Sequence, residues 1–188
     1  MMPTILEIPE VRQRVSPLTV AEYHQLGEFN GHGRRTELIR GIVIEKMSKS
    51  PLHRTITSLL YRLLLTRTPK GYTVWQEQPL TFADSEPEPD VAIIRGSERD
   101  FPDTHPPTAE LVIEVAISSA ALDRENASLY AEAGVKEYWI LLGDKKQVEV
   151  YRQPKSGKYQ ERKMFGVANI IECRSVPGVR IRLAELFA

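Results

Sequence analysis

Apolar side chains recur along this chain with two different periods. Three segments have the capping residues or the three- and four-residue apolar spacing of helices. They span about residues 19–27, 51–68 and 119–133. The second is the clearest, because Ser50 is a suitable N-cap, Pro51 suits the first turn, and five isoleucine and leucine residues between positions 56 and 64 form one stripe.

The remaining apolar segments have the composition of β-strands, and several are apolar enough to be buried on both faces. Strands are predicted over residues 37–47 (two, around a turn), 72–82, 90–94, 110–118, 137–142, 148–151, 159–165 and 179–183. The strand, helix, strand order of residues 110–142 favours a parallel pair with a right-handed crossover. The pattern therefore predicts an α/β or α+β fold with a mixed central sheet flanked by helices.

Length and composition limit the number of domains, the kind of partner and the compartment that we expect. The 188 residues suffice for a single domain over 1–188, which we divide into an N-terminal arm (1–17), a core (18–153) and C-terminal strands (154–188). The 25 basic and 25 acidic residues balance, so no net charge indicates a polyanionic partner. The single cysteine, Cys173, excludes an internal disulfide and fits a reducing compartment. Because no signal-peptide pattern and no apolar run of about 18 residues occur, we expect a cytoplasmic protein.

Two acidic residues interrupt the apolar strands. Glu114 lies in the middle of residues 110–118, and Asp90 opens the apolar run of residues 91–94. A buried, unpaired carboxylate is costly, and two on neighbouring strands repel each other unless a proton or cation lies between them. This arrangement predicts a Mg²⁺ site with the carbonyl of Val115 as a further oxygen ligand. The alternative is that Asp90 is a turn residue and Glu114 pairs with an arginine.

Further polar residues are candidates for the same site, each with a plain structural alternative. Glu37 is either a third carboxylate or a surface residue paired with a neighbouring arginine. His53, in the first turn of its helix, either contacts a phosphate or a water, or is simply a polar first-turn residue. Asp123, Asn126 and Tyr130 share one face of the third helix, which looks either toward the site or onto ordinary packing.

Charge is sorted locally although the total is zero. Residues 51–70 carry four basic residues and no acid, and residues 145–163 carry seven basic residues against Glu149 and Glu161. Such tracts bind phosphate backbones, or they are ordinary solvated faces.

Five motifs then occur in a familiar order. They are Glu-Leu-Ile-Arg-Gly (37–41), Ser-Pro-Leu-His (50–53), Pro-Glu-Pro-Asp-Val (87–91), Leu-Val-Ile-Glu-Val (111–115) and Leu-Tyr-Ala-Glu-Ala-Gly-Val-Lys-Glu-Tyr-Trp-Ile (129–140). Pro89-Asp90 with Ile113-Glu114-Val115 resembles the PD-(D/E)XK motif of the restriction-endonuclease-like nucleases. The ordered set resembles the Uma-type endonucleases of that superfamily over residues 17–153.

The resemblance implies a restriction-endonuclease-like αβββαβ core with C-terminal β additions. It implies Mg²⁺-dependent hydrolysis of phosphodiester bonds in DNA, with Mn²⁺ as a possible substitute, and a site built on Glu37, Asp90 and Glu114. The motif's lysine should lie two residues after Glu114, where Ala116 stands. Uma-type relatives place it four residues before the tyrosine of the third helix, where this chain has Asn126, which can hydrogen-bond but adds no charge.

Three hypotheses follow. The preferred one is a metal-dependent endonuclease, active as a homodimer, in which Asn126 replaces the lysine and His53 and Lys136 assist. The second is a catalytically impaired nuclease-like domain that binds nucleic acid or a protein partner. The third is a structural domain whose two carboxylates form ion pairs.

Overall fold

The computed structural model describes residues 8–27, 35–46, 48–118 and 120–187. The chain forms two compact units, one of residues 1–46 with 83–87 and the other of residues 47–82 with 88–188. Each unit is described by itself, and the single domain over residues 1–188 stays a prediction.

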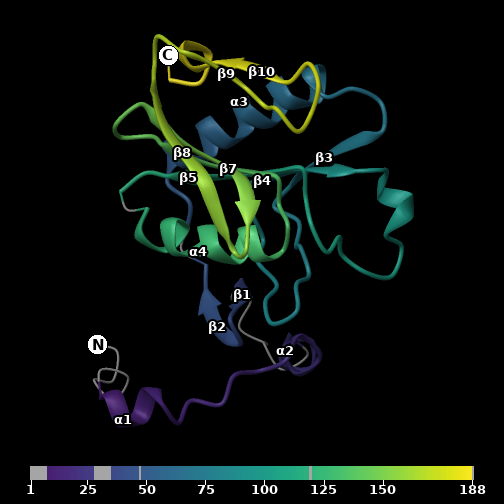
Figure 1. Ribbon diagram of the computed structural model, residues 1–188, viewed down its shortest axis with the longest axis vertical. Coiled ribbons are helices and arrows are strands. Elements are labelled where there is room, and N and C mark those ends of the chain that lie inside the picture. Colours follow the sequence, from purple (N-terminus) through teal and green to yellow (C-terminus); the bar gives the residue numbers. More distant parts are fainter. Residues whose placement is uncertain (1–7, 28–34, 47, 119, 188) are drawn as a thin grey trace. The chain divides into compact units, whose positions relative to one another are not determined.

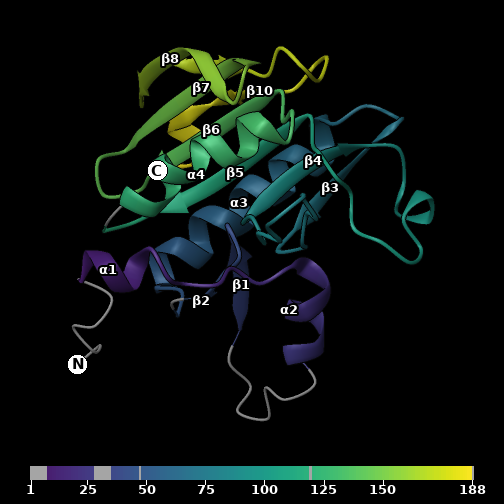
Figure 2. The ribbon, with the colours of Figure 1, turned by 60° about the horizontal axis from the view of Figure 1, so that its bottom comes forward.

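The larger unit is built on a mixed six-stranded sheet with the order β3-β4-β5-β6-β7-β8 (Figure 1, Figure 2). The strands are β3 (Tyr72–Gln76), β4 (Val91–Arg95), β5 (Leu111–Ala116), β6 (Glu137–Leu142), β7 (Gln147–Lys155) and β8 (Lys158–Gly166). Only β5 and β6 are parallel among the neighbouring strands of this sheet, and α4 (Ala121–Glu132) connects them. The parallel pair predicted from the sequence is therefore confirmed.

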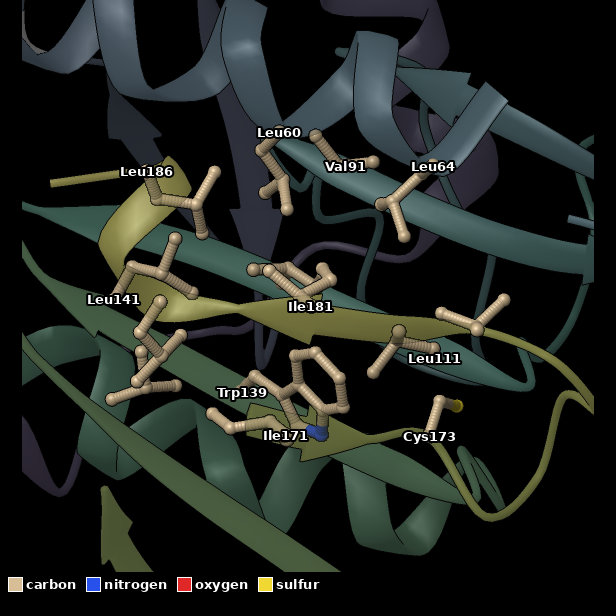
Figure 3. Packing of buried hydrophobic residues seen from close by; sticks show 14 of the residues in the cluster. Leu60, Leu64, Val91, Leu111, Trp139, Leu141, Ile171, Cys173, Ile181 and Leu186 are labelled. Carbon is tan, nitrogen blue, oxygen red and sulfur yellow. The ribbon is translucent and has the colours of Figure 1, made fainter. Parts of the chain in front are cut away.

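Helices and a short two-stranded sheet cover the two faces of the central sheet. α3 (Pro51–Arg67) lies on one face with β9 (Ile170–Glu172), β10 (Arg180–Arg182) and the 3₁₀ turn η3 (Leu183–Glu185), and α4 lies on the other (Figure 1, Figure 2). Figure 3 shows Leu60 and Leu64 of α3 near Val91, with Ile181 of β10 beside Leu111. Since both faces are covered, nearly every position of β4, β5 and β6 is apolar and buried.

Local signals set most element boundaries in this unit. The Ser50 side chain accepts a hydrogen bond from the backbone N–H of His53 at 3.2 Å, as expected of the N-cap. The hairpin of β7 and β8 turns at Ser156 and Gly157, whose φ values are 50° and 73°. Positive φ at both central residues is typical of the type I′ turn that suits a hairpin.

One strand of this unit was predicted too long, and another was not predicted. The strand predicted over residues 72–82 ends at Gln76, because Glu77 adopts a left-handed backbone with φ 52° that a strand does not accommodate. The sequence also gave no sign of β9, a strand of three residues. The connection between β4 and β5 carries one short 3₁₀ helix, η2 (Glu98–Asp100).

The smaller unit contains two helices and a hairpin. Its elements are α1 (Pro9–Arg12), α2 (Val20–Gly27), β1 (Thr36–Ile39) and β2 (Ile42–Glu45). Thr19 and Glu22 form a capping box at the start of α2, with the backbone N–H of each bonded to the side chain of the other. The hairpin turns at Arg40 and Gly41, and a Cβ at Gly41 would lie 2.4 Å from Pro17 Cβ, so only glycine fits there. The predicted N-terminal arm includes the single turn of α1.

Among the helices within the described residues, none combines the length and the apolar character needed to cross a membrane.

Candidate active site

Antiparallel pairing brings Asp90 and Glu114 side by side in the larger unit. In the register of β4 and β5, Val91 lies opposite Ile113, so the next pair is Asp90 and Glu114. The backbone N–H of Asp90 donates to Glu114 Oε2 at 3.2 Å, and the backbone N–H of Val115 donates to Asp90 Oδ2 at 2.8 Å. The two carboxylates that interrupt the apolar pattern therefore meet where the β4–β5 ladder ends.

Glu77 adds a third carboxylate residue at the same level of the sheet. Gln76 lies opposite Val91, and the next pair, Glu77 and Asp90, is joined by a hydrogen bond from the Glu77 N–H to the Asp90 carbonyl at 3.2 Å. Glu77 follows the last residue of β3, Asp90 precedes the first residue of β4, and Glu114 lies beside Asp90 on β5. We call these three residues the carboxylate row. Sequence reasoning missed Glu77 because it lay within a predicted strand, although its left-handed backbone marks a special position.

Lys49 supplies the positive charge that the motif analysis did not find. Its Nζ lies 2.8 Å from Asp90 Oδ1 and 2.9 Å from Glu77 Oε1. Burial by itself would lower the pKa of Lys49, but the attraction of Asp90, together with hydrogen bonds to both carboxylates, raises it above its usual value. An ammonium ion therefore lies between two members of the carboxylate row. No sequence motif marked Lys49, which is 41 residues from Asp90 along the chain.

His53 contacts Asp90 from the first turn of α3. Its Nε2 lies 3.0 Å from Asp90 Oδ2, and its Nδ1 lies 3.4 Å from Thr57 Oγ1 one turn later. Burial by itself would raise the pKa of Asp90, but the hydrogen bond and charge of His53, followed by those of Lys49, lower it to about 2. Asp90 is therefore ionised throughout the neutral pH range.

This low pKa predicts that Asp90 makes the unfolding free energy depend on pH. The folded-state pKa of about 2 lies below the ordinary value of 3.8, so the ionised group stabilises the fold above about pH 4, and that stabilisation is lost as the pH falls through 2. We expect the stability difference between wild type and Asp90→Asn to shrink by roughly 2 kcal/mol between pH 6 and pH 2. Urea unfolding in EDTA measures it, with Asp103→Asn in an exposed loop as the control; a gap that does not change with pH would contradict the assignment.

Tyr130 of α4 holds the second carboxylate. Its hydroxyl, on a fully buried ring, donates to Glu114 Oε1 at 2.9 Å. One turn earlier on the same helix, Asn126 is 6% exposed. The predicted face of the third helix is therefore directed into the protein, and through Tyr130 it contacts the carboxylate row.

The donor atoms at this place suit a hard divalent cation. Asp90 and Glu114 offer carboxylate oxygens and Val115 a backbone carbonyl, the ligand types that Mg²⁺ and Mn²⁺ prefer. Throughout the described parts of the chain, no three His, Cys, Asp or Glu side chains are grouped so as to hold a metal ion. A cation here would thus have two carboxylates, a carbonyl and water, and Mg²⁺ usually keeps several waters. The residues fit the metal by donor chemistry, and Asp90 would share its oxygens with Lys49 and His53.

Comparison with known protein families identifies relatives of this chain. A family model described as "Uma2: Putative restriction endonuclease" matches residues 20–184. The chain belongs to the Uma2 family. The resemblance carried by the five sequence motifs is therefore confirmed.

A solved structure shows the same fold as this Uma2 chain. It is the crystal structure of a putative nuclease belonging to DUF820 from Anabaena variabilis, with a TM-score of 0.77 and 20% sequence identity. The match covers 91% of this chain and 98% of that one, so the mixed α/β fold is shared over nearly the whole of both. No match was found among curated proteins.

Glu37 and Lys136 were also predicted to act at the site of this Uma2 chain. Glu37 belongs to the smaller unit, where Lys46 Nζ lies 3.7 Å from its Oε2, and its part in the site stays a prediction. Lys136 precedes β6 at the level of Glu110, four residues along the sheet from Glu114, or about 13 Å. The register therefore does not bring Lys136 beside Glu114, and its assistance at the site stays a prediction.

Several basic residues of the tract 145–163 form ion pairs with acidic residues of the same chain. Arg152 pairs with Glu137 at 2.9 Å, Arg162 with Glu149 at 2.7 Å, and Lys163 with Glu161 at 3.0 Å. On α3, Arg67 pairs with Glu185 at 2.7 Å, whereas Arg54 and Arg62 are exposed. A count of charges along the sequence therefore overstated how much free positive charge residues 145–163 present. The overstatement is smaller for α3.

Proposed function

We propose that this Uma2 protein is a metal-dependent endonuclease that hydrolyses phosphodiester bonds of DNA. The observation that carries the proposal is the adjacency of Asp90 and Glu114 where the pairing of β4 with β5 ends, with Lys49 and His53 bonded to Asp90. The element order α3-β3-β4-β5-α4-β6 supports it, since αβββαβ is the core that the resemblance to restriction-endonuclease-like nucleases implies.

In this proposal Asp90, Glu114 and the carbonyl of Val115 hold one Mg²⁺ or Mn²⁺. When bound, the cation lowers the pKa of a coordinated water and offsets negative charge on the scissile phosphate. Glu37 remains a proposed acidic residue of the site through the family motif alone. A homodimer, which would present two sites to the two strands of a duplex, belongs to the same proposal.

The chain's own residues orient and charge the site. Lys49, fixed between two carboxylates, holds Asp90 in one orientation and places an ammonium where negative charge develops on a phosphate. His53 holds the second oxygen of Asp90 and is itself oriented by Thr57. The Tyr130 hydroxyl holds Glu114. These bonds fix the carboxylates before substrate arrives, which reduces the reorganisation needed during reaction.

The experiment is the cleavage of supercoiled plasmid by purified protein in Mg²⁺, Mn²⁺ or EDTA. Nicked or linear product with a metal ion and none in EDTA supports the proposal. Absence of product with either ion, together with salt-sensitive DNA binding, would instead support the impaired nuclease-like domain. Asn126 at the family's lysine position is the observation that favours that second function.

We expect Lys49 to take over the charge of the missing family lysine. Lys49→Gln should lower the cleavage rate about 100-fold, the usual cost of removing one group that stabilises transition-state charge. Asn126→Lys in the same background should recover part of the rate. Calorimetric titration with Mn²⁺ separates this role from a structural one, because Lys49→Gln removes a competing cation and should not weaken Mn²⁺ binding.

The matched control for Lys49 is Lys70→Gln, at an exposed position beyond the end of α3. It should cleave and bind Mn²⁺ like the wild type. Wild-type cleavage by Lys49→Gln would remove the lysine from the proposed mechanism.

A further inference from the structure

A pocket of about 580 Å³ lies beside β3 in the larger unit. β3 is an edge strand of the six-stranded sheet, paired only with β4 among the described strands (Figure 1). The walls come from α3, from β3 and the residues just after it, and from the loop between β4 and β5. The candidate active site uses none of the side chains that line it.

Three aromatic side chains line this edge pocket: Tyr61 of α3, Trp75 of β3 and Phe101 of the loop. The rings of Trp75 and Phe101 pack edge to face, with centroids 6.1 Å apart and an interplanar angle of 81°. Aromatic side chains in an open pocket are platforms on which unpaired nucleobases stack.

Polar groups in the pocket can bond the edge of a base. Gln76 and Gln78 each carry an amide donor and acceptor, and the Glu98 carboxylate accepts hydrogen bonds. The Trp75 side chain is itself only 9% exposed, so the partly exposed rings of Tyr61 and Phe101 offer the faces for stacking.

The edge pocket and the carboxylate row are built on the same two elements. α3 carries His53 in its first turn and Tyr61 eight residues later, a rise of about 12 Å. β3 carries Trp75 two residues before Glu77. A distance of about 12 Å corresponds to roughly three or four nucleotides at 3.4 Å per nucleotide of one strand. A strand whose phosphate lies at Asp90 can therefore place a nearby base in the pocket.

We propose that the edge pocket receives one unpaired nucleobase with an exocyclic amino group, adenine or cytosine, from the strand held at the carboxylate row. This inference rests on the proposed nuclease function. Glu98 determines which chemical group the pocket can accept, because its carboxylate repels a phosphate but accepts a hydrogen bond from the amino group of either base. The aromatic rings supply stacking, and the glutamine amides bond the remaining edge of the base.

The test compares single-stranded 12-mers of dA, dC or dT with an abasic 12-mer of the same charge, bound to wild-type protein in EDTA so that none is cut. Stacking predicts that the dA and dC 12-mers bind roughly 5- to 100-fold more tightly than the abasic one. Tyr61→Ala and Gln78→Ala should reduce that preference, and Glu98→Gln should reduce the preference for dC over dT. Gln160→Ala on β8, at the opposite edge of the sheet, is the matched control and should change neither.

Gln78 and Glu98 are exposed, so their variants test the pocket even if Tyr61→Ala fails to fold. Equal binding of base-bearing and abasic 12-mers would contradict base binding in the pocket. It would not affect plasmid cleavage, and hence the proposed function would stand. A protein partner in the pocket would give that same result. Failure to bind any 12-mer, together with no plasmid cleavage, would overturn both.

Discussion

Asp90→Ala should lower metal-dependent plasmid cleavage about 1000-fold or more. The variant loses the carboxylate that lies next to Glu114 and that fixes both Lys49 and His53. A bound metal ion is worth several kcal/mol of transition-state stabilisation, and about 4 kcal/mol corresponds to a factor of 1000. Mn²⁺ calorimetry should show a matching loss of binding, which ties the lost activity to the cation.

The control for Asp90 is Glu172→Gln, an exposed carboxylate on β9 that lies outside the carboxylate row. It should cut plasmid at the wild-type rate. Circular dichroism should show that Asp90→Ala keeps its secondary structure. If folded Asp90→Ala cut plasmid as well as the wild type, the carboxylate row would not be the catalytic centre.

The largest effect on stability should come from Arg152→Ala. Arg152 Nε lies 2.9 Å from Glu137 Oε2, and the two residues are 5% and 2% exposed. Glu137 also accepts hydrogen bonds from the Trp139 indole and from the backbone N–H of Ser175, so it cannot turn out to water without breaking them. Breaking a buried pair leaves an uncompensated charge, which costs about 3–5 kcal/mol of unfolding free energy.

Arg95→Ala is the matched control for that prediction, because Arg95 Nε also lies 2.9 Å from a carboxylate oxygen, of Glu110. The Arg95 side chain is 68% exposed, so its pair is screened by water and should contribute at most about 1 kcal/mol. Urea unfolding measures both variants. Similar losses would show that burial does not decide the strength of these pairs.

The sequence predicted the central sheet well where burial is uniform. β6 has the predicted bounds, Glu137–Leu142, because a short apolar run covered on both faces is visible within its own residues. The strand prediction failed where a residue with a left-handed backbone ends a strand and the sequence carries no local signal for it, as at Glu77 after β3. It also missed β9, since three residues are too few to show a period.

The residues of the candidate site likewise fall into those that the sequence could indicate and those that it could not. Asp90 and Glu114 could be found because a carboxylate in an apolar strand is an anomaly within a window of about ten residues. Glu77 and Lys49 could not, because each is an ordinary polar residue in its own segment. The displaced family lysine drew attention to Asn126, whereas the ammonium bonded to Asp90 comes from the residue before the cap of α3.

The sequence by itself determined that one carboxylate lies within a strand buried on both faces and that another precedes such a strand, and that one helix crosses between a parallel pair. It also determined family membership through five ordered motifs. The tertiary structure alone decided which basic side chain pairs with Asp90 and which arginines form ion pairs within the protein. The reason is that hydrophobic periodicity repeats within one element, whereas a contact such as Lys49 to Asp90 depends on how separate elements pack.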